Sequence, residues 1–119
     1  MSKVESKAEL ARRQRLPRDE YNSQMKDRTR AQILAAALSI AKRYGLVSVK
    51  RDAVASEANC AAGTVNFHFQ TVAMLHNEVI KEAIRTRALR VIAEGIVGGY
   101  QSTRGVKEPL RSEALASYK

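Results

Sequence analysis

The chain has 119 residues, with 21 Lys and Arg against 12 Asp and Glu, and a formal net charge of +9 at pH 7. This length suits one domain with a modest core, and the basic excess favours polyanionic partners, nucleic acid ahead of an anionic membrane surface. The single cysteine excludes an internal disulfide, and no hydrophobic run reaches the length of a signal peptide or membrane span.

Sequence patterns of catalysis and cofactor binding are missing. No Cys/His cluster has zinc-ligand spacing, and neither a Walker A motif nor a dinucleotide-binding glycine pattern occurs. The carboxylates are scattered, and His68 and His76 have no evident nucleophile or metal partner. We therefore expect no enzyme activity, no cofactor and no metal. Cys60 is small and apolar enough to fill space under a turn, and this structural role is favoured over redox sensing.

Residues 1–26 form a polar, basic N-terminal arm. Its densest cluster of positive charge comprises Arg12, Arg13, Arg15 and Arg18, and Arg28 follows just beyond the arm. These five arginines are candidate DNA contacts, because such arms lie along phosphates or enter a minor groove in some helix-turn-helix proteins. The alternative is a solvated leader that makes no contact, and the sequence favours neither.

The strongest helix pattern spans residues 27–44. Ile33, Ala37, Ile40 and Tyr44 form one apolar stripe, which Leu34, Leu38 and Ala41 widen. Gly45 is expected to end this helix as a C-terminal cap. Ser48 is a candidate cap for the helix that follows.

Two short helices joined by a tight turn are predicted between Arg51 and Phe69. Val54 and Ala55 give the first helix an apolar side, and Val65 and Phe69 do the same for the second. Asn59 lies where the chain must reverse, and asparagine tolerates the left-handed conformation. The pattern is typical of a helix-turn-helix unit, in which two helices cross closely at a steep angle.

A fourth, longer helix is predicted from Val72 to about residue 94. Thr71 can cap its start, and glycines at 95, 98 and 99 break its pattern. Residues 95–119 then form a polar C-terminal tail with one candidate short helix ending near Tyr118. The predicted domain therefore covers residues 27–94, and the fold class is all-α: a three-helix core, a longer fourth helix and a tail.

An ordered set of residues in this core matches a known family without gaps in spacing. The set is Ile33, Leu34, Ala35, Ala36, Ala37, Gly45, Val54, Ala55, Glu57, Ala58, Gly63, Thr64, Val65, His68, Phe69 and Leu75. From Arg30 to Leu75 the chain thus resembles the DNA-binding domain of the TetR family of bacterial transcriptional repressors. The resemblance implies sequence-specific binding of double-stranded DNA and repression by occupancy of an operator.

The candidate DNA-binding residues lie in and around the two short helices. They are Lys50, Arg51, Ala61, Ala62, Gly63, Thr64, Asn66, Phe67 and His68. Lys50 and Arg51 can replace by charge the hydroxyl pair that the family usually has nearby, and His68 matches the family's phosphate-contacting histidine. Asn66 stands where the family commonly has an aromatic residue, and asparagine can pair with adenine. At the position of Val72 the family often has a lysine that contacts phosphate, and this contact is missing here. Asn66 as a plain solvent-facing residue, or His68 as a structural one, is the alternative.

The resemblance also implies a homodimer on a near-palindromic site. The sequence predicts the interface on the distal part of the fourth helix, at Val79, Ala83, Ile84, Val91 and Ile92, because such a stripe would otherwise stay exposed. Too few residues follow Val72 for an enclosed drug-sized cavity, so no small-molecule inducer is expected. No membrane partner is expected either. The protein is expected in the cytoplasm of a bacterium, with a gene that is bacterial or carried by a phage or plasmid. A protein-interaction module, for example one that binds polymerase or another regulator, is the alternative function.

Overall fold

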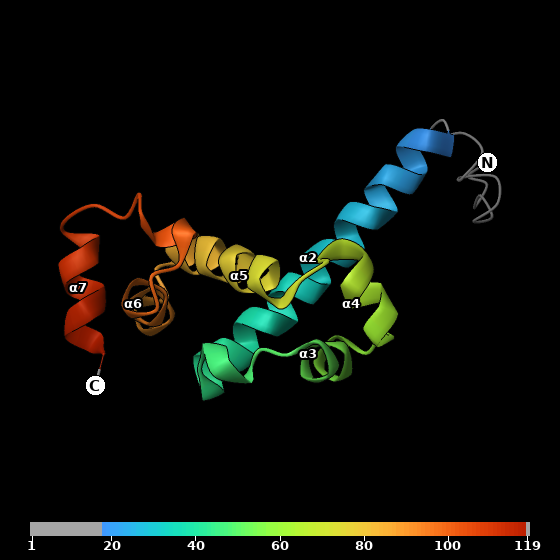
Figure 1. The fold of residues 1–119 in the computed structure, drawn as a ribbon. Helices are drawn as coiled ribbons and strands as arrows, with labels where there is room; N and C mark the ends of the chain where they lie inside the picture. Colours follow the sequence, from blue (N-terminus) through green and yellow to red (C-terminus); the bar gives the residue numbers. More distant parts are fainter. Residues whose placement is uncertain (1–17, 119) are drawn as a thin grey trace, which may run out of the picture.

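The structure is a computed structural model that describes residues 18–118, and throughout this range the chain is all-α, as predicted. The helices are α2 (Arg18–Tyr44), α3 (Arg51–Ala58), α4 (Ala62–His68), α5 (Val72–Thr86), α6 (Leu89–Val97) and α7 (Leu110–Ser117), with 3-10 turns η1 (Leu46–Ser48) and η2 (Gln101–Thr103). In Figure 1, α2 runs as a long rod from one end of the molecule into its centre. The cluster Arg12, Arg13 and Arg15 lies outside the described residues.

Helix α2 is longer than predicted, because it begins at Arg18 and not at residue 27. Residues 18–26, assigned to the arm, are therefore helical. The core face is as expected at Ile33, Ala37 and Ile40, which are buried, whereas Tyr44 is 65% exposed and does not belong to it. The buried Leu46 follows Gly45, which ends α2 with a φ of 95° and an N–H bond of 2.9 Å to the Ala41 carbonyl.

Helices α3 and α4 form the predicted helix-turn-helix. Asn59 reverses the chain in the left-handed region, with φ 57° and ψ 50°, as its side chain permits. Val54, Val65 and Phe69 are buried against α2 and hold the unit together. The predicted cap is wrong: α3 begins after Lys50, without a side-chain cap bond, and the Ser48 hydroxyl donates to the Tyr44 carbonyl instead.

The predicted fourth helix is two helices. The Thr71 hydroxyl caps α5 by accepting the Met74 N–H at 3.0 Å, as expected. However, α5 ends at Arg87, which has a left-handed φ of 59°. The N–H of Ala88 then bonds to the Ala83 carbonyl, and α6 runs in a different direction from α5, so that Figure 1 shows α6 end-on. No glycine or proline marks this break, so the helical period continues through it in the sequence.

This change of direction buries the apolar stripe that was predicted to be a dimer interface. Val79, Ala83, Val91 and Ile92 are each at most 1% exposed within one chain, and only Ile84 is partly exposed. The stripe is thus core, because α5 and α6 cover each other, and it leaves no apolar face for a second copy there. The homodimer remains a prediction, but these residues cannot form its interface.

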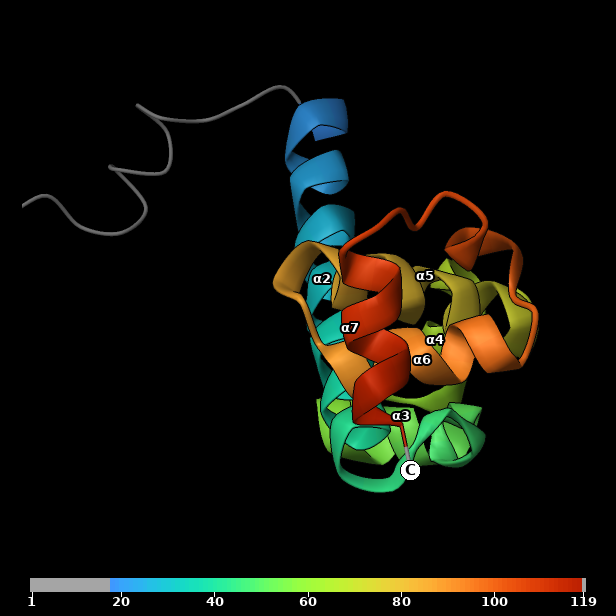
Figure 2. The same ribbon diagram turned by 90° about the vertical axis from the view of Figure 1, so that its left-hand side faces the viewer.

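The C-terminal residues complete a second layer of the fold, which consists of α5, α6, η2 and α7. Helix α7 packs across α6 (Figure 2) and buries Ala114, which confirms the short helix predicted in the tail. Gly95 does not end α6: a Cβ there would lie 2.8 Å from atoms of Ile80 and Thr103, so the glycine allows α5 and η2 to approach closely. In the described part of the chain, no helix is long and apolar enough to cross a membrane.

Candidate nucleic-acid interface

Helix α4 presents one face to the core and the other to solvent. Val65 and Phe69 are buried, four residues apart on the inner face. Asn66 is exposed, Phe67 is 59% exposed, and Thr64 is half-buried at the edge. Because consecutive helical residues project about 100° apart, anchoring Val65 and Phe69 turns Asn66 and Phe67 outward. The apolar face predicted at Val65 and Phe69 is therefore confirmed, and Asn66 and Phe67 project from the opposite side.

The first turn of α4 offers little side-chain bulk. Ala61 and Gly63 are exposed, and Ala62 is half-buried against the core. A Cβ added at Gly63 would have no atom within 4 Å, so packing inside this chain does not require glycine at that position. The small side chains leave the backbone of this turn open to close approach by a large partner such as a nucleic-acid strand.

Two exposed basic residues mark the start of α3. Lys50 is extended, with φ −121° and ψ 156°, and Arg51 opens the helix beside it. The Arg43 guanidinium, at the end of α2, makes a 2.9 Å ion pair with Glu57 and so ties α2 to α3. The charges of Lys50 and Arg51 remain available to a phosphate.

The helical extension of α2 adds positive charge beside α4. The Lys26 Nζ lies 5.6 Å from the centroid of the Phe67 ring, and Arg30 lies 4.8 Å from that of Phe69. Arg30 also pairs with Glu78 at 3.1 Å, which ties α2 to α5. Residues at i and i+4 share a helix face, whereas Arg28 is two positions from both and projects from the opposite side of α2. Arg28 is exposed there, away from α4.

Lys26 and Arg30 were missed by the sequence analysis. Their four-residue spacing was visible, but a helix start at residue 27 put Lys26 in the arm and hid the shared face. The positive charges of Lys26 and Arg30 also act on His68, whose ring packs edge-on against Phe67 with centroids 5.1 Å apart. Burial, then the charges of Arg30 and Lys26, lower the pKa of His68 below its ordinary value. The lowered pKa favours the neutral imidazole of His68 in the free protein.

This lowered pKa gives a testable pH dependence. If DNA places a phosphate beside His68, that phosphate favours the charged imidazole, so binding should take up a proton and affinity should rise as pH falls. Between about pH 7.5 and 5.5, the slope of log affinity against log salt should steepen by about 0.9, one charged phosphate contact. Folding follows the opposite sign, since a depressed folded-state pKa favours the unfolded chain as pH falls through about 6.5.

Fluorescence anisotropy of labelled duplex DNA at both pH values measures the slope. His68→Gln keeps a hydrogen-bonding side chain but cannot take up the proton, so its slope should not change with pH. If the variant shows the same steepening as wild type, the proton is taken up elsewhere and His68 does not contact phosphate.

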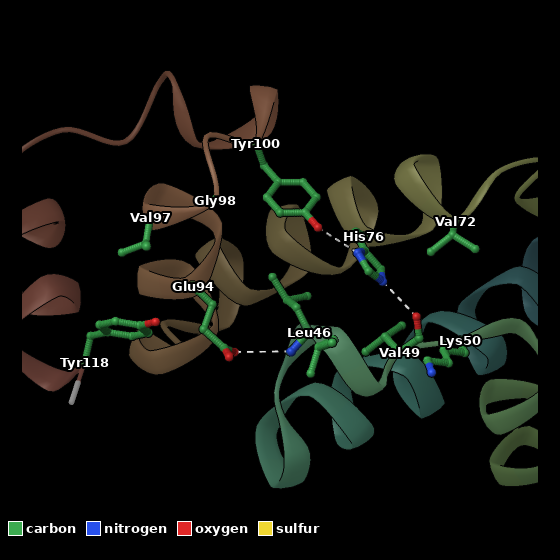
Figure 3. Close-up of a pocket in the computed structure, with 11 residues that line it drawn as sticks. Leu46, Val49, Lys50, Val72, His76, Glu94, Val97, Gly98, Tyr100 and Tyr118 are labelled. Carbon is green, nitrogen blue, oxygen red and sulfur yellow. Dashed lines mark hydrogen bonds between the residues drawn. The ribbon is translucent and has the colours of Figure 1, made fainter.

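An open cleft lies between the helix-turn-helix and the second layer (Figure 3). Its volume is about 610 Å³, and it is lined by Leu46, Val47, Val49, Lys50, Val72, His76, Glu94, Val97, Gly98, Tyr100 and Tyr118. His76 is a buried polar residue on its wall, and the sequence analysis found no partner for it. It has two: the Val49 carbonyl, 2.7 Å from Nε2, and the Tyr100 hydroxyl, 2.8 Å from Nδ1. Residues so distant in sequence gave no pattern that could reveal this contact.

The fold thus exposes Asn66 and Phe67 of α4, Lys26 of α2, and the basic pair Lys50 and Arg51 at the start of α3. No protein-family model, curated protein or solved structure matches this chain.

Proposed function

We propose that this protein binds double-stranded DNA in a sequence-specific manner and regulates transcription, most directly as a repressor that occupies an operator. The observation that carries the proposal is the exposed face of α4: Asn66 and Phe67 project from a helix that Val65 and Phe69 anchor, and Lys26 lies over the Phe67 ring. A helix presented in this way can enter a major groove.

The charges around α4 support a division of roles. Lys50, Arg51 and Lys26 would neutralise phosphates and supply most of the affinity, because cations released from DNA favour binding. Asn66 would accept from and donate to one adenine edge, and the Phe67 ring would contact a thymine methyl group. The net charge of +9 agrees with a polyanionic partner. The resemblance to TetR DNA-binding domains further implies that the protein represses transcription and binds as a two-fold dimer.

Selection of bound sites from random duplex DNA with the purified chain tests this function. We expect one enriched sequence, with two inverted half-sites about one helical turn apart if the protein binds as a two-fold dimer. Binding should weaken steeply with salt. Recovery of random sequences after repeated rounds would refute sequence-specific binding, and a single half-site would refute the dimeric mode.

Lys26 provides a sharper test of the interface. Replacing Lys26 by alanine should make the slope of log affinity against log salt shallower by about 0.9, because one phosphate contact is lost. The matched control is Arg28→Ala, which removes the same charge from the opposite side of α2 and should change the slope much less. Equal effects of both substitutions would show that the charge acts from a distance and that Lys26 makes no contact.

A second candidate function is a protein-interaction module. It is favoured by apolar side chains that stand exposed at the cleft: Val47 is 77%, Val97 58% and Tyr118 43% exposed. This surface is separate from the exposed face of α4. A chain that selects no DNA sequence but binds a partner protein, and loses that partner with Val47→Asp or Val97→Asp, would support this function in place of DNA binding.

A further inference from the structure

His76 joins three parts of the chain that are distant in sequence. It lies on α5, its Nε2 contacts the carbonyl of Val49 at 2.7 Å, and its Nδ1 contacts the hydroxyl of Tyr100 at 2.8 Å (Figure 3). Val49 is fully buried and immediately precedes Lys50, after which α3 begins. His76 therefore holds the peptide group that immediately precedes Lys50 and the start of α3.

The Val49 carbonyl determines the tautomer of the ring. A carbonyl oxygen can only accept, so Nε2 of His76 carries a proton and donates to Val49. In the neutral imidazole, Nδ1 is then an acceptor, and the Tyr100 hydroxyl donates to it. Removing the Tyr100 hydroxyl would leave Nδ1 without its partner, and only the contact with Val49 would then hold the ring.

Tyr100 is itself held by close packing. A Cβ added at Gly98 would lie 2.9 Å from Cε1 of the Tyr100 ring, so glycine leaves room for the ring at the end of α6. The Thr103 hydroxyl donates to the Tyr100 carbonyl at 2.7 Å. The position of the Tyr100 hydroxyl thus reports how α6 and η2 are packed.

The start of α3 depends on these contacts because it is not capped locally. Lys50 makes no side-chain cap bond, and Ser48 bonds backward to α2. The other end of the connection between α2 and α3 is also held from the second layer, where the Glu94 carboxylate accepts the Leu46 N–H at 3.3 Å. Side chains of α5 and α6 therefore hold both ends of the segment that carries Lys50.

We propose that His76 is a positioning residue for DNA binding: it fixes the Val49 carbonyl, and through it Lys50 and Arg51, while the Tyr100 hydroxyl holds the imidazole ring in place by donating to Nδ1. This proposal rests on the proposed function. Its consequence is that the packing of α6 and η2 acts on the phosphate-binding start of α3 through one imidazole ring, without contact between Tyr100 and DNA.

Tyr100→Phe tests the proposal, because it removes one oxygen and keeps the ring. In the full chain labelled with ¹⁵N, we expect the His76 Nδ1 signal to shift, because Nδ1 loses its hydrogen-bond donor, and the Lys50 and Arg51 amide signals to shift as the ring moves. Affinity for the selected DNA site should fall about two- to tenfold, the worth of one net hydrogen bond. Tyr118→Phe, the matched control on the other side of the cleft, should change none of these.

A second variant, Gly98→Ala, displaces the Tyr100 ring and should reproduce the loss of affinity and the shifts at Lys50. Urea denaturation of each variant shows that the binding assay is made on folded protein. Wild-type affinity in Tyr100→Phe, or unchanged His76 and Lys50 signals, would overturn the positioning role. If the wild-type chain selects no DNA sequence at all, the proposed function fails instead, whereas wild-type affinity in Tyr100→Phe refutes the positioning role alone.

Discussion

Ile92→Ala is expected to lower the free energy of unfolding by about 2–5 kcal/mol, because it removes a fully buried side chain and leaves a cavity between α5 and α6. Urea denaturation measures this loss at two protein concentrations tenfold apart. The loss should be the same at both concentrations, since Ile92 is buried by its own chain and not by a second copy.

The matched control is Val97→Ala, because Val97 lies on the same helix but is 58% exposed. We expect its effect on stability to stay within about 0.5 kcal/mol. If Ile92→Ala were nearly neutral for the monomer but shifted the dissociation of a dimer in sedimentation equilibrium, Ile92 would belong to an interface between copies and not to the core.

Asn66→Ala is expected to reduce discrimination at one base pair of the bound site by about 1–3 kcal/mol, because a paired contact to one adenine edge is lost. Site selection repeated with the variant should return the wild-type sequence with one position relaxed. Stability should change little, since Asn66 is exposed.

Ser56→Ala is the control for Asn66→Ala, as Ser56 is also exposed but lies on α3. Its selected sequence should equal that of wild type. An unchanged sequence for Asn66→Ala as well would remove Asn66 from base recognition, and Phe67 would then be the next residue of α4 to replace.

Much of the helix-turn-helix could be predicted because its signals are local. Asn59 at the turn, Thr71 at the start of α5 and Gly45 at the end of α2 each act through their own backbone or a hydrogen bond to a residue nearby. The spacing of Val65 and Phe69 likewise predicted which face of α4 is buried and therefore that Asn66 and Phe67 project outward.

The start of α2 and the residues beside α4 were predicted less well. The polar composition of residues 18–26 gave no apolar stripe, so the helix was expected to begin at residue 27, and Lys26 was assigned to the arm. A polar helical segment without an apolar stripe gives no periodic signal in the sequence. The contact of Lys26 with the Phe67 ring became visible only in the folded chain.

The sequence by itself therefore determined the helical class, the helix-turn-helix and the outward face of α4, because helical period and capping are written in neighbouring residues. Only the tertiary structure decided that α5 and α6 separate at Arg87 and bury Val91 and Ile92 in one chain, and that His76 reaches Val49 and Tyr100. An unbroken helix would expose its apolar far half to water, whereas the break at Arg87 allows that surface to be buried. The free energy gained by this burial outweighs the conformational cost of a left-handed arginine. Such a balance depends on which segments meet, and local sequence does not record it.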